Sequence, residues 1–426
     1  MPPEPTERHW PSHTPTNEGV MTQQKAPPTT MAPGPTTRAR LFFVDNLRVV
    51  LTVLVVLHHA ALTYSNIPLW FYIEPAQDPS GHALDLFIIL NQTFFMGMFF
   101  LLAGYFVPGA ADRRGRRGFT RERLVRLGVP LLLFVILLRP LASAPSYTTL
   151  LATEPDLPYW LFYLFTIAPG PLWFAEVLLV MSLVYVLIRR FRERRSTTVV
   201  DVTGFDAGAG VAARAERPAN TAPLNWFGMG WFVPFMLFAV GLALVTIAWR
   251  YAFPASYWPI VGLPSPGYLP QYAALFALGV FAYRRNWLIR LPNSAGWGGL
   301  AVALVSLIGL GASVIVLGEA AMVPRTWQSM VGVPVETFFA MGVMLALVVF
   351  FRRFLNRSNR FLKFLADNAF AVYVLHSVVL VWVGVALSGW EAGALVKFFG
   401  LAALSVPLCW AVAGAVRAIP GVKRIL

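Results

Sequence analysis

The sequence predicts an all-α fold, a polytopic bundle of about ten transmembrane helices with both termini in the cytoplasm. Of its 426 residues, 57% are apolar and 13% are charged, a composition that excludes a soluble globular protein. Apolar stretches long enough to cross a bilayer recur from about residue 47 to residue 417. Because these stretches are continuous and lack two-residue alternation, they predict helices and exclude a transmembrane β-barrel.

Each helix is predicted from a run of about twenty apolar residues that is bounded by charged residues, Pro or Gly. The run at 157–168, between Pro158 and Pro169, is too short to span and predicts a re-entrant or interfacial segment. The runs of spanning length lie at 47–67, 84–107, 124–142, 171–189, 229–249, 268–283, 296–317, 331–351, 367–388 and 394–417.

Basic residues are distributed unevenly between the two sides of the membrane. Counting from the N-terminal tail, every second segment between predicted helices is basic, and these segments together hold 30 of the 34 Lys and Arg residues. This bias places those segments, and both termini, in the cytoplasm. It also accounts for the net charge of +14, and since no recognition motif is present we expect no nucleic-acid partner.

Composition divides the chain into three parts. Residues 1–40 hold nine Pro and eight Thr and are predicted to form a disordered cytoplasmic tail. Residues 41–417 form the transmembrane domain, with a flexible cytoplasmic loop at about 190–228, and residues 418–426 form a cytoplasmic C-terminal tail. The single cysteine, Cys409, excludes an internal disulfide and a cysteine metal site, and we expect no metal.

The first predicted helix carries Arg48 near its start and His59 eleven residues later. Eleven residues are close to three helical turns, so both side chains lie on one face, about 16 Å apart along the axis. His58 is rotated by about 100° and faces elsewhere. A buried neutral imidazole at His59 could accept a proton, or it could simply hydrogen-bond between packed helices. Asp45 could pair with Arg48 or cap the helix.

Two more arginines stand at the start of the third predicted helix. Arg123 and Arg126 lie three residues apart on one face, partly inside the apolar segment. Two guanidinium groups in this position suit an anionic phosphate group at the cytoplasmic mouth. The alternative is that they only set topology, as we infer for the basic run 113–117.

Three further positions carry polar groups inside predicted helices. Glu176 lies near the outer surface and could hydrogen-bond a neighbouring helix, orient His59, or bind a hydroxylated substrate beside Trp173. Tyr373 and His376 share one face near mid-bilayer, where helix packing is the favoured interpretation and substrate binding the alternative.

The order of these motifs resembles the acyltransferase-3 family of bacterial integral-membrane acyltransferases. The sequence around Val44–Arg48 and His58–Ser65 is similar to the branch of the family that contains glucan-modifying acyltransferases. One departure from the family pattern is Ala103, where Ser is commoner before Gly104 and Tyr105. The resemblance covers residues 41–417 and rests on Arg-x10-His at Arg48 and His59, Phe-Phe-x3-Gly-Tyr at 99–105, Arg-x2-Arg at Arg123 and Arg126, Pro-Leu-Trp-Phe at 171–174, and Tyr-x2-His at Tyr373 and His376.

The resemblance implies transfer of an acetyl or succinyl group from cytoplasmic acyl-CoA to a hydroxyl of an extracytoplasmic or lipid-linked carbohydrate. It implies that His59 is the catalytic histidine and that Arg48, Arg123 and Arg126 bind the donor. We expect acyl-CoA as co-substrate, a carbohydrate or glycolipid acceptor, and a multi-pass protein of the bacterial inner (plasma) membrane. Glu176 is a candidate to orient His59 or the sugar, and Trp173 to stack on a sugar ring.

Two other classes of function remain open at this point. A secondary transporter or flippase for a sugar-containing or lipid-linked substrate would also need a polar midplane and arginines at its mouth. A sensor or scaffold would use the histidines only to pack helices. The sequence leaves undecided the acceptor, the acyl group, direct transfer as against an acyl-histidine intermediate, and the oligomeric state.

Overall fold

The computed structural model describes residues 1, 40–203, 230–254 and 266–426. Leu41–Leu426 forms one compact unit, separate from Met1–Arg40. The predicted disordered tail and most of the predicted loop at 190–228 therefore lie outside the described residues. The regular elements of the described residues are all helical, as predicted.

Each of the ten predicted runs corresponds to a described helix, and these helices differ in length from the predictions by a few residues to a turn or more. The run at 157–168 forms only the eight-residue helix α5. The principal helices are α1 (Phe42–Tyr64), α2 (Gly81–Arg123), α3 (Val129–Leu133), α4 (Arg139–Leu150), α5 (Tyr159–Thr166), α6 (Trp173–Thr203), α8 (Phe232–Ala252), α9 (Leu269–Arg285), α10 (Trp287–Arg290), α11 (Asn293–Leu317), α12 (Trp327–Phe354), α13 (Arg360–Ala386) and α14 (Ala394–Ala418).

Eight helical segments in the described part of the chain are long and apolar enough to cross a membrane. One of them, Gly81–Leu150, is 70 residues long and contains the second and third predicted helices. The helix is interrupted between these two predicted helices at Gly115, whose φ of 66° and ψ of 173° are not helical. A positive φ of this kind favours glycine. The remaining predicted span, α9, is 17 residues long, about three turns shorter than α13 with its 27 residues.

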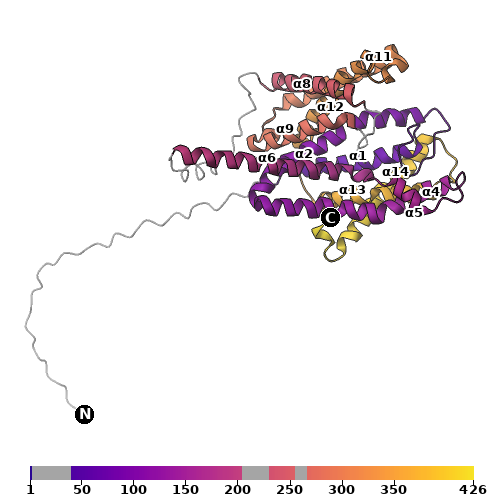
Figure 1. Cartoon of the computed structure of the whole chain (residues 1–426), viewed down its shortest axis with the longest axis horizontal. Coiled ribbons are helices and arrows are strands. Elements are labelled where there is room, and N and C mark those ends of the chain that lie inside the picture. Colours follow the sequence, from indigo (N-terminus) through magenta and orange to yellow (C-terminus); the bar gives the residue numbers. More distant parts are fainter. Residues whose placement is uncertain (2–39, 204–229, 255–265) are drawn as a thin grey trace, which may run out of the picture. The chain divides into compact units, whose positions relative to one another are not determined.

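Helix α1 lies at the centre of the bundle and packs against α2, α12, α13 and α14 (Figure 1). Two other extensive contacts join α2 to α9 and α11 to α12. Small residues permit the first of these: a side chain at Gly104 would collide with the backbone of Phe276, and one at Gly279 would lie 2.7 Å from the backbone nitrogen of Tyr105. The Gly-Tyr motif of α2 therefore lies where two helix backbones touch.

Helix α6 is longer than the sequence predicts. The predicted helix ends at residue 189, whereas α6 continues to Thr203 and so occupies the start of the stretch predicted to be a flexible loop. Arg189 explains part of this extension, because its guanidinium pairs with Glu193 one turn later at 2.8 Å and with Asp112 of α2 at 2.5 Å.

Candidate active site

A cavity of about 340 Å³ opens between α1, α2, α6 and α13, and its lining includes Arg48, Arg123 and Arg126. The rest of the lining is mostly apolar, from Met96 and Phe99 of α2 to Phe174 of α6 and Phe370 of α13. The three arginines that the sequence predicts to bind the donor thus share one cavity, hereafter the arginine-lined cavity. Its volume lies near the lower end of the range for small-molecule sites, roughly 300–1,000 Å³.

The three guanidinium groups differ in their surroundings. The side chain of Arg48 is 40% exposed and lies 4.0 Å from the Asp45 carboxylate, which is one of the two roles that the sequence allows for Asp45. Arg126 is 52% exposed and lies 3.5 Å from Glu122. Arg123 packs its guanidinium 4.9 Å from the centre of the Phe119 ring, and its Nε atom is buried without a hydrogen-bond partner among the described residues. A buried, unpaired donor is costly, so this position favours an anionic ligand.

The backbone around Arg126 is also unusual. Leu124–Gly128 forms a π-helical turn between α2 and α3. Such turns are rare and occur frequently at functional sites, because the extra residue in the turn changes the direction of the side chains that follow. Here the turn carries Arg126 at the end of the cavity that Arg48 and Arg123 also line.

The arginine-lined cavity follows one stripe of α1 toward His59. Arg48, Thr52 and Val55 line it, and His59 is the next residue on the same face, about 6 Å further along the axis. Helix α13 repeats this arrangement, because Tyr373 lines the cavity and His376 follows one turn later on the same face. Neither histidine belongs to the cavity lining, and both follow its lining residues Val55 and Tyr373 by about one helical turn, on the side away from Arg48.

The two histidines contact one another across the α1–α13 interface. The Nε2 atom of His376 lies 3.2 Å from Nδ1 of His59, and the ring centroids are 4.9 Å apart. Nδ1 of His59 is also 2.9 Å from the carbonyl oxygen of Val55, and Nδ1 of His376 is 2.7 Å from that of Tyr373.

These contacts define one consistent tautomer for each ring. A carbonyl oxygen only accepts hydrogen bonds, so the hydrogen of each neutral ring is on Nδ1. His59 then donates to Val55 and to the Nε2 lone pair of His376, and its own Nε2 keeps a lone pair. Within the described residues no hydrogen bond to that nitrogen is found. In this tautomer the Nε2 atom of His59 has the lone pair that a proton acceptor needs, and the opposite nitrogen of the ring contacts His376.

His58 faces a different part of the bundle. It is 6% exposed, its Nδ1 lies 3.4 Å from the side-chain nitrogen of Asn91, and its ring stacks on Phe95 with 5.0 Å between centroids. The helical rotation between neighbouring residues thus separates His58 from the arginine-lined cavity, as the sequence predicts.

A segment between α1 and α2, residues 66–80, covers His59 on the side away from the arginines; we call it the strap. The ring of Trp70 packs against His59 with 4.1 Å between centroids, and its Nε1 atom is buried without a hydrogen-bond partner in the described part of the chain. Asp78 anchors the strap by accepting a hydrogen bond of 2.7 Å from the backbone N–H of Ala394, at the start of α14. The hydrogen bonds of Asp78 with Ser80 and with Ala394 lower the pKa of its carboxyl group.

The family comparison agrees with this arrangement. Residues 41–414 match the model of the acyltransferase-3 family, described as an acyltransferase domain. The chain belongs to this family. Searches of curated proteins and of solved structures find no match. Family and fold together identify a multi-pass membrane acyltransferase.

The other predicted site residues of this acyltransferase, Tyr373, Trp173 and Glu176, differ in their surroundings. Tyr373 lines the arginine-lined cavity, and its hydroxyl donates a 2.6 Å hydrogen bond to the carbonyl of Pro171. Trp173 is 7% exposed and packs 5.4 Å from the ring of Tyr272 in the core. Glu176 is half-buried, and no hydrogen bond or ion pair with the described residues is found for it, whereas the ring of His59 contacts Val55 and His376.

One buried ionic cluster joins α8 to α12. Arg250 at the end of α8 pairs with Glu336 of α12 at 2.7 Å and 3.3 Å, and the hydroxyl of Tyr268 donates to the same carboxylate. Both charged side chains are about 85% buried, being 13% and 15% exposed. A charge inside a membrane bundle is costly unless it is paired, and this pairing ties α8 to α12.

Proposed function

We propose that this acyltransferase moves an acyl group, acetyl or succinyl, from cytoplasmic acyl-CoA to a hydroxyl of an extracytoplasmic or lipid-linked carbohydrate. One observation carries the proposal: a single cavity is lined by three arginines, and its lining on α1 and α13 stops about one helical turn short of a pair of hydrogen-bonded histidines. This matches a donor that has phosphates at one end and a reactive thioester at the other.

The arginine end of the cavity suits the nucleotide of the donor. Arg48 and Arg126 are accessible, whereas Arg123 supplies a buried donor group, so phosphates could be bound from the surface inward. A cavity of about 340 Å³ is narrow, and we infer that it takes the pantetheine arm while the adenosine part stays outside. The arm would follow Thr52 and Val55 toward His59, over the roughly 16 Å that separate Arg48 from His59 along the axis.

At the far end, His59 acts as the general base. Its Nε2 takes the proton of the acceptor hydroxyl while that oxygen attacks the thioester carbonyl carbon. The carbon–sulfur bond breaks, and the departing sulfur takes the proton from His59 to give free coenzyme A. During this step the Nδ1–H of the charged ring stays hydrogen-bonded to Val55 and His376, which stabilises the charge. An acyl-histidine intermediate is the variant of this route.

The acceptor would approach from the side of the strap. Trp70, in contact with His59, offers an aromatic face and a buried N–H group without a partner, features suited to a sugar ring and its hydroxyl. Glu176 remains a candidate acceptor for a further sugar hydroxyl, whereas Trp173 would need to leave its core position to stack on a sugar. The similarity of the α1 sequence to the branch with glucan-modifying acyltransferases supports a carbohydrate acceptor. The basic segments support a bacterial inner (plasma) membrane location with cytoplasmic termini.

Purified protein distinguishes this function from transport. We would incubate it with acetyl-CoA or succinyl-CoA, with and without envelope carbohydrate, and measure free coenzyme A together with acyl groups on the carbohydrate. Coenzyme release that depends on the acceptor, with equal amounts of sugar acylated, is the expected result. Movement of a lipid-linked sugar across vesicles without consumption of either donor would overturn the proposal in favour of a transporter or flippase.

A further inference from the structure

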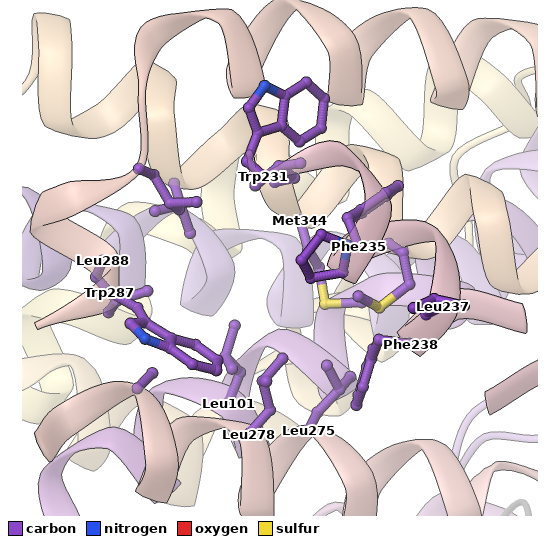
Figure 2. A pocket seen from close by; sticks show the side chains of 16 residues that line it. Leu101, Trp231, Phe235, Leu237, Phe238, Leu275, Leu278, Trp287, Leu288 and Met344 are labelled. Carbon is purple, nitrogen blue, oxygen red and sulfur yellow. The ribbon is translucent and has the colours of Figure 1, made fainter. Parts of the chain in front are cut away.

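A second cavity of about 510 Å³ lies on the other side of α2, and we call it the apolar cavity. Its lining comes from α2, α8, α9, α10 and α12 and consists of apolar residues. Figure 2 shows Trp231, Phe235 and Phe238 facing Leu101, Leu275 and Leu278 across it. Helix α2 separates the two cavities, because Leu101 lines the apolar cavity and Leu102 lines the arginine-lined cavity.

The apolar cavity runs along the helices. On α12 it extends from Met341 to Val348, which is seven residues or about 10 Å of helix. Helix α8 forms its outer wall, and Leu237, one of the lining residues, is 65% exposed on the surface that faces lipid. An elongated apolar space next to the bilayer suits a hydrocarbon chain, because the indole N–H groups of Trp231 and Trp287 are the only polar side-chain groups among its lining residues.

One end of the apolar cavity is strongly basic. Trp287 and Leu288 of α10 line this end, together with Trp231 at the start of α8. The guanidinium of Arg285 lies 5.7 Å from the centre of the Trp287 ring, and Arg352 donates to the carbonyl of Leu288 at 3.2 Å. Tryptophans beside arginines are typical of the interface between hydrocarbon and headgroups.

The charges at this end favour an anion. Five arginines, Arg284, Arg285, Arg290, Arg352 and Arg353, occur in the segments 284–290 and 352–353, which contain no acidic residue. The described hydrogen bonds of Arg352 go to neutral oxygens, the carbonyls of α10 and the side chain of Asn293. Asp112 of α2 lies 3.8 Å from Arg284 and also pairs with Arg189 at 2.5 Å.

We propose that the apolar cavity and its basic end form a binding site for an anionic phospholipid. One acyl chain occupies the cavity between α8, α9 and α12, and the phosphate of the headgroup lies at the arginines of α9 and α12. Selectivity comes from the headgroup, because a chain gains little on moving from lipid tails into an equally apolar cavity, whereas basic pockets between transmembrane helices bind anionic headgroups. This inference does not depend on the acyl-transfer proposal.

The test is native mass spectrometry of the full chain in detergent, titrated with phosphatidylglycerol and with phosphatidylcholine of identical chains. The wild type is expected to bind the first phosphatidylglycerol about tenfold more tightly than phosphatidylcholine. The double variant Arg285→Gln/Arg352→Gln removes the two arginines that contact the lining residues Trp287 and Leu288, and it is expected to bind the two lipids equally. Arg113→Gln/Arg117→Gln removes the same charge from exposed positions outside the site and is expected to keep the preference.

A cavity-filling variant tests the chain separately from the headgroup. Leu278→Trp places a large ring in the apolar cavity and is expected to weaken phosphatidylglycerol binding several-fold, whereas Leu244→Trp, on the exposed face of α8, is expected not to. Equal binding of the two lipids by the wild type would overturn the proposal. So would a preference that survives both site variants, or a lipid-linked sugar that binds there and is not displaced by phosphatidylglycerol.

Discussion

The Nε2 atom of His376 accepts a hydrogen bond from Nδ1 of His59 at 3.2 Å, although the two residues are 317 positions apart. In our proposal the contact gives them different roles. His59 uses the lone pair on its Nε2 for proton transfer, whereas His376, whose Nδ1 lies 2.7 Å from the carbonyl oxygen of Tyr373, positions His59.

Replacing His376 tests its role as a positioning residue. His376→Leu removes the hydrogen-bond acceptor, and we expect kcat to fall by about ten- to a hundredfold with little change in the KM for acyl-CoA. His376→Gln restores a carbonyl oxygen and should recover part of the loss. Steady-state kinetics of both variants check this, and equal losses in the two would indicate that His376 only fills space.

Replacing Arg123 tests the donor end. A charge-assisted hydrogen bond contributes about 1.5–3 kcal/mol, so Arg123→Ala should raise the KM for acyl-CoA by about ten- to a hundredfold. The control is Arg117→Ala, an exposed arginine that lies outside the cavity lining. An unchanged KM in the Arg123 variant would remove this residue from donor binding.

Replacing Trp70 tests the strap as a cover over His59. Trp70→Ala opens the histidine pair to water, so we expect hydrolysis of acyl-CoA without an acceptor to rise several-fold relative to acyl transfer. Trp160→Ala removes a tryptophan that is 67% exposed on α5 and serves as the control. If the ratio of hydrolysis to transfer is the same in both variants, the strap does not exclude water.

Replacing Gly279 tests the α2–α9 contact independently of function. The added side chain of Gly279→Val meets backbone atoms of Leu101 and Tyr105, which have no room to move, so we expect a loss of at least about 1–3 kcal/mol of stability. Gly241→Val makes the same change on α8, where no atom lies within 4 Å. Thermal unfolding in detergent should separate the two variants, and equal melting temperatures would show that the α2–α9 approach is not tight.

The sequence predicts well what depends on a single helix. Hydrophobic runs locate the helices, and the eleven-residue spacing puts Arg48 and His59 on the face of α1 that lines or adjoins the arginine-lined cavity. The separation of His58 from that face follows from the same geometry.

Features that depend on contacts between distant segments were not predictable in this way. Helical periodicity singles out Tyr373 and His376 as a pair but says nothing of their contact with α1, and Trp70 lies in a segment without periodicity. The sequence also says nothing of the burial of Trp173, which is 7% exposed in the core, and stacking of this ring on a sugar stays a prediction. The end of α6 was misplaced because charged residues beyond 189 continue the helix through ion pairs.

The central claim is that His59, at the end of a donor cavity, carries out acyl transfer. The most direct measurement is radiolabel transfer from acetyl-CoA and succinyl-CoA into envelope carbohydrate by cells that express wild type, His58→Ala or His59→Ala at matched membrane levels. We expect His59→Ala to reduce label transfer at least about a hundredfold, and we expect His58→Ala to retain most of the transfer activity. Equal labelling by all three proteins would contradict the account.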